Sequence, residues 1–303
     1  MHIPDGFLSP SVAATGWAVA ATGVASALRA ERREAAPMPA GILGSVAAFL
    51  FAVQLVNVPV AAGTSGHLVG ATLAAVLLGP WRALLAVAAV LSVQALLFQD
   101  GGIVAYGANL IDMGFSGCFV GYAIARVAGR LVSGPRGIAA GAVVGAFAAT
   151  VSGAVGVSIW LGLSRLYPLS GILPVMLVTH VAIGLLEAAL TGAILVPLLR
   201  WRPDLVAGLD ASEVRRRPTV LALGLLGAAL TVAAFLAPFA SALPDGLEKT
   251  AETLGFASRA RTLLPGLSDV APAVAGVIGT VAAAALAFTV GRKLEPVDDD
   301  AHR

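Results

Sequence analysis

The chain begins Met1-His2, a pairing of residues that can chelate a metal ion. We expect Met1 to be the mature N-terminus, because no basic segment precedes an apolar run as a cleavable signal peptide requires. The free amine of Met1, the amide nitrogen of His2 and the His2 imidazole can then close adjacent chelate rings on one ion. Such a nitrogen-rich, nearly planar set suits Ni(II) and Cu(II).

His67 is the candidate for a fourth nitrogen ligand, because imidazole is the commonest metal ligand among side chains. The residues before the first apolar run can reach about 30 Å when extended, so His2 and His67 can meet. Two plainer interpretations stay open: His67 is a hydrogen-bonded loop histidine, and His2 is a disordered terminal residue. Glycines surround both histidines. They favour the joint site, since close backbone approach needs glycine.

Other polar side chains stand in apolar surroundings or beside them. His180 and Glu187 lie seven positions apart on one expected helix face. Ionisable groups inside a membrane are costly and usually functional, but this pair could also satisfy each other or a neighbouring helix. An ordinary solvated charge explains an acidic loop residue equally well. The candidates for a supporting or pathway role are Asp100, Asn109, Asp112, His180 and Glu187.

Membrane-spanning helices are the elements that must position these residues. Of 303 residues, 58% are hydrophobic and 12% are charged, whereas soluble domains have about 25% charged residues. The apolar stretches run to about 18 residues or more, enough to cross a hydrocarbon core of about 30 Å. The excess of basic residues is therefore explained by membrane topology and not by nucleic-acid binding. A single cysteine, Cys118, excludes a disulfide framework.

The sequence predicts an all-α polytopic protein with about nine transmembrane helices. Fifteen of the 19 Lys and Arg residues fall on one side, and only Arg165, Lys249, Arg259 and Arg261 on the other. Because basic loops stay cytoplasmic, we expect the N-terminus outside and the C-terminus inside, in a bacterial plasma membrane. The expected spans are residues 11–28, 40–60, 62–79, 82–98, 107–128, 137–162, 172–199, 218–240 and 269–290.

A polar, basic stretch divides the chain into two units. We expect a seven-helix metal-binding transport unit at 1–200, a cytoplasmic linker at 201–217 and a two-helix unit at 218–303. The loop of the second unit carries Asp245 and Glu248 on the side expected for His2 and His67. There it could steady the N-terminal segment or open an entry route for the metal, and local capping or pairing is the alternative.

Several of these segments resemble a known family. The runs Met1 to Phe7, Gly63 to Leu68, Gln99 to Ile103 with Gly107 to Asn109, and His180 to Glu187 look like signature segments of the substrate-binding membrane subunit of cobalt/nickel energy-coupling-factor importers (the CbiM/NikM family). This resemblance covers roughly residues 1–200. Pro244-Asp245-Gly246-Leu247-Glu248 resembles the PDGLE segment of the accessory subunit (CbiN/NikN-like). The chain thus looks like a fusion of the two subunits.

The resemblance implies that the Met1 amine, the His2 amide and imidazole, and His67 bind a transported Ni²⁺ or Co²⁺. It implies no catalytic cofactor and no enzyme activity. ATP would be hydrolysed by separate cytoplasmic ATPase subunits that act through a transmembrane coupling subunit. The sequence contains no Walker A loop, which agrees with that division of labour.

Two other functions stay open on the sequence alone. One is a secondary metal transporter, with His180, Glu187 and Asp112 as a proton relay. The other is an intramembrane metallohydrolase, which the chain favours less because it has no HExxH helix and Glu187 lies at the wrong spacing from His180. The sequence does not distinguish nickel from cobalt.

Overall fold

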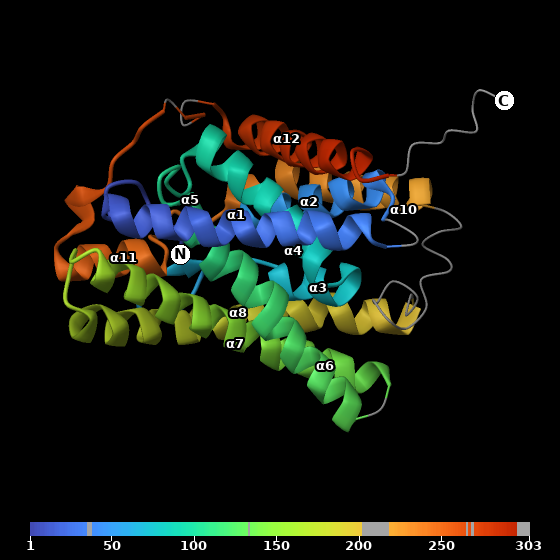
Figure 1. Cartoon of the computed structure of the whole chain (residues 1–303), viewed down its shortest axis with the longest axis horizontal. Coiled ribbons are helices and arrows are strands. Elements are labelled where there is room, and N and C mark those ends of the chain that lie inside the picture. The colour runs from blue at the N-terminus through green and yellow to red at the C-terminus, as the bar shows by residue number, and fades with distance from the viewer. Residues whose placement is uncertain (35–37, 133, 202–217, 265, 268–269, 296–303) are drawn as a thin grey trace.

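The computed structural model describes residues 1–34, 38–132, 134–201, 218–264, 266–267 and 270–295. Long apolar helices lie side by side along its longest axis (Figure 1). Within the described residues, seven helices are long and apolar enough to cross a membrane. The protein is a helical multi-pass membrane protein, as predicted. The predicted linker lies outside the described residues, apart from Trp201.

The helices and strands follow one another with few long loops between them. In chain order they are α1 (Pro10–Arg32), α2 (Ala40–Gln54), β1 (Val58–Pro59), η1 (Ala61–Gly63), β2 (Ser65–Gly66), α3 (Ala71–Leu78), α4 (Pro80–Val93), η2 (Gln94–Phe98), α5 (Tyr106–Asn109), η3 (Leu110–Gly121), α6 (Tyr122–Leu131), α7 (Pro135–Leu163), α8 (Leu169–Trp201), α10 (Pro218–Thr231), η5 (Val232–Leu236), η6 (Ala237–Phe239), α11 (Gly246–Leu254), η7 (Ala257–Arg259) and α12 (Pro272–Arg292).

The prediction of a helical span at residues 62–79 is wrong in its first half, and the span predicted at 40–60 is helical only as far as Gln54. Strands β1 and β2 form a short antiparallel hairpin, and helix α3 begins only at Ala71. The physical reason is the density of glycine: Gly63 and Gly70 have φ values of +69° and +72°, which other residues rarely adopt. Non-helical backbone of this kind is tolerated at membrane depth only where protein covers it.

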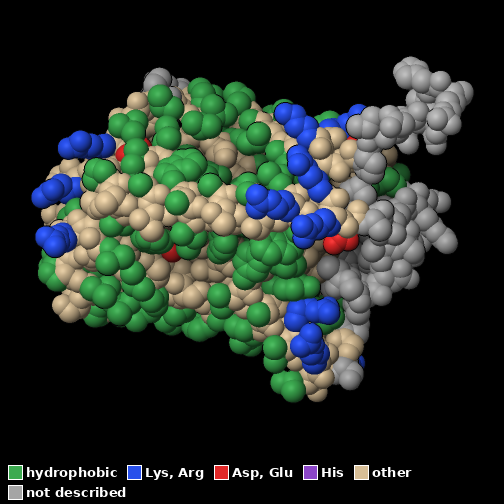
Figure 2. All heavy atoms as spheres, in the orientation of Figure 1, with side chains coloured by type: hydrophobic (Ala, Val, Ile, Leu, Met, Phe, Trp, Pro, Cys, Tyr) green, Lys and Arg blue, Asp and Glu red, His purple; other side chains and the backbone are tan. Residues whose placement is uncertain are grey.

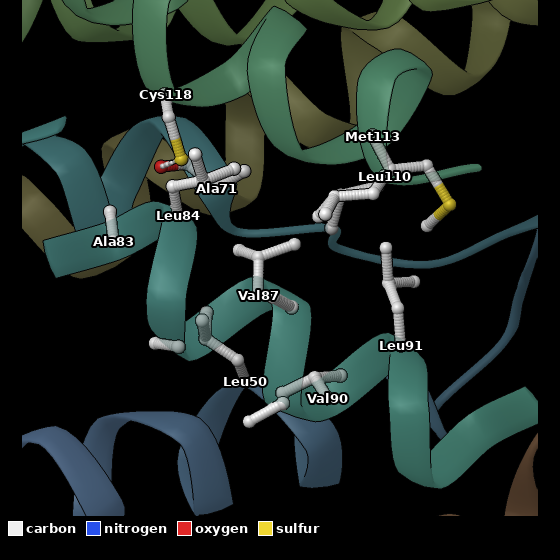
Figure 3. Packing of buried hydrophobic residues seen from close by; sticks show 14 of the residues in the cluster. Leu50, Ala71, Ala83, Leu84, Val87, Val90, Leu91, Leu110, Met113 and Cys118 are labelled. Atoms are coloured by element: carbon white, nitrogen blue, oxygen red, sulfur yellow. Dashed lines mark hydrogen bonds between the residues drawn. The ribbon is translucent and has the colours of Figure 1, made fainter. Parts of the chain in front are cut away.

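Helix α4 is the centre of the bundle. After Arg82 in its first turn, its sequence is apolar on nearly all sides, as expected of a helix that is buried all round. Leu84, Val87 and Leu91 are almost fully buried. They meet Leu110 of η3 and Leu50 of α2 in one cluster (Figure 3). This core holds together the segments that carry the candidate ligands.

The last two spans, α10 and α12, pack against α2. Ser45 donates a hydrogen bond through Oγ to the carbonyl oxygen of Ala222 at 2.8 Å. A Cβ on Gly44 would lie 2.8 Å from the carbonyl oxygen of Ala284, so only glycine permits this approach. Small residues at such contacts let membrane helices pack closely. The two-helix unit is therefore part of the same bundle.

Charged side chains gather towards the two ends of the visible face, and hydrophobic side chains lie between them (Figure 2). At one end, Nε of Arg82 donates to Oε2 of Glu31 at 2.6 Å, joining the start of α4 to the end of α1. This arrangement suits a bilayer across the middle of the bundle. Which end faces the cytoplasm stays a prediction.

Candidate metal centre

The first residues of the chain are buried inside the bundle and are not a disordered tail. The exposed fractions of Met1, His2 and Ile3 are 8%, 7% and 0%. The backbone amide of Ile3 donates to Oδ1 of Asn109 at 2.7 Å, and Nδ2 of Asn109 donates to the Ile3 carbonyl at 3.0 Å. Asn109, a predicted supporting residue, therefore fixes the N-terminal segment by bonding to both backbone groups of Ile3.

Asp5 fixes the other end of this segment. Its carboxylate accepts hydrogen bonds from the backbone amides of Ile103, Val104 and Ala105 at 2.8 to 3.3 Å. Its carbonyl oxygen accepts a bond from the amide of Arg261 at 2.8 Å. Loops from both units of the chain thus enclose the N-terminus.

His2 and His67 lie face to face. Their ring centroids are 5.8 Å apart and their planes differ by 22°. Nδ1 of His2 lies 2.9 Å from Oδ1 of Asp100. Gly101 has a φ of +93°, and a Cβ on it would lie 3.4 Å from the His2 ring. The chain therefore brings the two predicted histidines and Asp100 to one place.

Two glutamines, which the sequence analysis did not single out, connect His2 to the segment of His67. Nε2 of His2 lies 3.2 Å from Oε1 of Gln94. Nε2 of Gln94 donates to Oε1 of Gln54 at 2.7 Å, and Nε2 of Gln54 donates to the carbonyl oxygen of Val69 at 2.8 Å. A polar amide in each of two apolar spans was the signal that could have found them.

This relay fixes the hydrogen-bonding role of the His2 ring. The Val69 carbonyl only accepts, so the Gln54 amide must present its nitrogen there and its oxygen to Gln94. Gln94 in turn presents its oxygen to His2, which makes Nε2 of His2 a donor. Nδ1 is consequently the ring nitrogen left for a metal, and it is the one that a chelate with the N-terminal amine requires.

His67 is buried and electrically neutral. Burial, followed by the charges of the Met1 amine and His2, lowers the pKa of His67 from 6.5 to about 4. Among the described residues, its Nδ1 has no hydrogen-bond partner. An unprotonated imidazole with a free ring nitrogen is the form that binds metals.

Two carboxylates complete the electrostatics of the centre. The Met1 amine lies 2.7 Å from Oδ2 of Asp245. Burial alone would raise the pKa of the Asp245 carboxyl, but the charge and hydrogen bond of that amine lower it well below its usual range. Desolvation would also raise the pKa of Asp100, whose side chain is about half exposed, but the charge of His2 and the hydrogen bond to it lower that pKa. Both carboxylates are thus held in their charged forms.

The PDGLE segment combines the two roles that the sequence left open. Oδ1 of Asp245 accepts from the amides of Leu247 and Glu248 at 2.7 and 2.8 Å, and Glu248 bonds back to the Asp245 amide at 2.9 Å. This capping box begins helix α11. The backbone carbonyl of Pro244 accepts from the amide of Ser65 at 2.8 Å, close to His67. Asp245 therefore caps locally and also reaches the N-terminus.

His180 and Glu187 do not pair with each other. The two carboxylate oxygens of Glu187 accept from the amides of Val69 and Gly70 at 2.7 and 2.9 Å, which fixes the backbone that follows His67. Nδ1 of His180 lies 2.8 Å from the carbonyl oxygen of Met176. In the described part of the chain, Nε2 of His180 has no partner.

Asp112 lies apart from these contacts, inside η3. Nε1 of Trp160 donates to its Oδ1 at 3.1 Å. Oδ2 is buried and finds no partner in the residues that the structure describes. The same residues contain no cluster of three or more His, Cys, Asp and Glu side chains suited to a metal. The expected ligand set needs none, because two of its nitrogens come from the backbone of Met1 and His2.

Comparison with known proteins shows to which family the chain belongs. Residues 2–205 match the model of the family described as cobalt uptake substrate-specific transmembrane region, CbiM. The chain belongs to the CbiM family. Residues 219–268 match the PDGLE domain, so the predicted fusion of these two modules is confirmed.

Relatives of known name share this organisation. An Archaeoglobus fulgidus protein, provisionally named a fused nickel transport protein NikMN, is 34% identical over 96% of this chain and 98% of its own length. The fused nickel transport protein NikMN of Rhodobacter capsulatus is 34% identical over 68% of this chain and 64% of its own. The crystal structure of a transition metal transporter is 33% identical, covers 72% of this chain and all of that one, and superimposes with a TM-score of 0.60.

Proposed function

We propose that the chain is the substrate-capture membrane component of an ATP-driven importer for Ni²⁺ or Co²⁺. The observation that carries this proposal is the face-to-face approach of His2 and His67 at a buried N-terminal amine. The amine, the amide nitrogen of His2, Nδ1 of His2 and a ring nitrogen of His67 supply four nitrogens. Four nitrogens in one plane suit Ni(II), and the relatives named for nickel and cobalt transport agree with this choice.

Binding requires an exchange of partners that the contacts define. Nδ1 of His2 leaves Asp100 and the Met1 amine leaves Asp245, each giving up a proton, and the backbone N–H of His2 gives up its proton as that nitrogen becomes a ligand. Nε2–H of His2 keeps its bond to Gln94, which holds the ring in the tautomer that a metal needs. A ligand histidine usually has its other ring nitrogen fixed by such an outer partner.

Energy must come from outside this chain. It has no Walker A loop, so we propose that cytoplasmic ATPase subunits act on it through a transmembrane coupling subunit. The contacts do not favour a proton relay that starts at His180 and Glu187, because Glu187 bonds to the backbone amides of Val69 and Gly70 and His180 to the carbonyl oxygen of Met176. The protein acts as a carrier in this proposal and not as an enzyme.

The test is to extend the N-terminus by one alanine before Met1. The added residue turns the amine into an amide and moves the new amine away from the chelate. The native protein should bind one Ni²⁺ per chain, measured by metal analysis after gel filtration, and the extended protein should bind none tightly. A chain extended instead at its C-terminus is the control. Equal binding by all three proteins would contradict the proposed site.

The pH dependence provides a second measurement on the same proteins. Metal binding to the amine displaces a proton, so affinity should rise with pH through the neutral range. His67 contributes nothing to this rise above about pH 5, because its pKa of about 4 leaves it unprotonated there.

A further inference from the structure

A small interior cavity shares Met1 with the candidate metal centre. Its wall includes Thr72 of α3, Asp112 of η3, Thr150 of α7 and Glu187 of α8. All four side chains are at least 95% buried. The cavity has room for about one water molecule. Four helices therefore each supply a buried oxygen-bearing side chain to one point in the membrane.

Asp112 provides the strongest indication of a ligand. Its Oδ1 is bonded to Trp160, but within the described residues its Oδ2 has no donor. A buried carboxylate oxygen without a partner is costly. Acidic groups kept inside a membrane at such a cost commonly mark an ion pathway.

Two glycines of α7 leave the space in which Met1 and Asp112 lie close to this helix. A Cβ on Gly153 would lie 2.8 Å from Cε and 3.3 Å from Sδ of Met1, and 2.6 Å from the carbonyl oxygen of Asp112. A Cβ on Gly156 would overlap Oδ1 of Asp112. Side chains larger than hydrogen would push these groups apart. Asp112 also belongs to a π-helical segment, a feature that is frequent at functional sites.

The cavity lies between the candidate metal centre and the apolar plug, a buried cluster formed by Leu73, Val76, Ala125, Ile138, Ala142, Leu195 and Leu199. His67 lies shortly before α3, and along α3 Thr72 precedes Leu73 and Val76 of that plug. Along α8, Leu195 follows Glu187. Along α7, Ile138 of the plug lies beyond Thr150 in the same direction. An ion that leaves His67 towards the far side of the membrane therefore meets the cavity before the plug.

We propose that Asp112, Glu187 and the Met1 thioether form a transit site for the divalent cation, an inference that rests on the proposed function. The cation would occupy this site after it leaves the nitrogen ligands. Two carboxylates and a thioether bind Ni²⁺ and Co²⁺ more weakly than four nitrogens do. A weaker second position favours release, because conduction requires sites that an ion can leave. Opening of the apolar plug would then complete the passage.

The test uses Asp112→Asn in the full chain, assembled with its partner subunits in proteoliposomes. Asparagine keeps an oxygen for the Trp160 donor and replaces the other carboxyl oxygen of Asp112 with an amide nitrogen, which cannot bind a cation. High-affinity binding should remain at one Ni²⁺ per chain, while uptake should fall roughly 10-fold or more, since intramembrane charges on ion pathways are functional. Thr191→Val is the matched control, because Thr191 is fully buried on α8 one turn beyond Glu187 but does not line the cavity. It should transport normally.

A direct measurement separates an ion site from a structural role. In a background carrying both His2→Ala and His67→Ala, which removes the two imidazole ligands, Co²⁺ titration followed by visible absorption should show a weak site, and adding Asp112→Asn should abolish it. Native uptake by Asp112→Asn would overturn the inference, and so would reduced uptake with the weak site intact. Failure of the native protein to bind any tight ion would instead contradict the proposed function.

Discussion

The amine of Met1 and the carboxylate of Asp245 lie 2.7 Å apart, so the first residue of the chain touches the PDGLE loop of the second unit. One oxygen of Asp245 caps α11 and the other holds the amine. Asp245 prefers the protonated amine, whereas a metal needs the unprotonated one. The carboxylate and the metal therefore compete for the same nitrogen.

Asp245→Asn should tighten the apparent Ni²⁺ affinity at neutral pH by about tenfold, because a charge-assisted hydrogen bond contributes roughly 1.5 kcal/mol or more. Asparagine still caps α11 through its oxygen. Competition with a chelator measures the affinity. Glu252→Gln, on the exposed side of α11, is the control and should change nothing. Weaker binding by Asp245→Asn would mean that Asp245 positions the amine and does not compete for it.

His67→Ala should weaken metal binding by at least the roughly 10- to 100-fold typical of losing an outer partner of a ligand, since it removes a ligand itself. His180→Ala should have a smaller effect, because Nδ1 of His180 bonds within α8 and His180 is not one of the four proposed nitrogen ligands. Isothermal titration of both variants gives the order. A larger loss for His180→Ala would move the site towards α8.

Gln94→Met tests the relay that orients His2. It removes the acceptor for Nε2–H and keeps a side chain of similar length, so we expect affinity to fall by roughly 10- to 100-fold. Gln99→Asn is the comparison, because Gln99 lies nearby but bonds to no described residue through Nε2. Unchanged affinity for Gln94→Met would show that the chelate rings alone orient His2.

His67 should make the stability of the folded protein depend on pH in the acidic range. Its pKa is lowered from 6.5 to about 4 in the folded protein. Between these values the unfolded chain binds a proton that the folded chain does not, so stability falls as pH falls from 6.5 to about 4. Thermal denaturation in detergent with a chelator present measures this, and His67→Gln should flatten the dependence. An equal slope in the variant would place the effect at other groups.

The part of the fold that could be predicted followed from the lengths of the apolar stretches in the sequence. Residues 137–162 and 172–199 were expected as spans, and α7 and α8 cover them. Residues 62–79 were also expected as a span, but their glycines favour a hairpin before α3 that average hydropathy does not register. Whether such a segment is a helix depends on the protein that covers its backbone.

The sequence by itself determined the membrane class and the two-module organisation, because composition and short motifs are local properties of the chain. It predicted the pairing of His2 with His67 but left plainer roles for both histidines open. Only the tertiary structure decided which groups hold those ligands: Gln94 and Gln54 for the His2 ring, Glu187 for the backbone after His67, and Asp245 for the amine. These partners are separated by up to hundreds of positions. Burial forces them together, because a polar group inside a membrane protein must find its hydrogen bonds wherever the packed helices provide them.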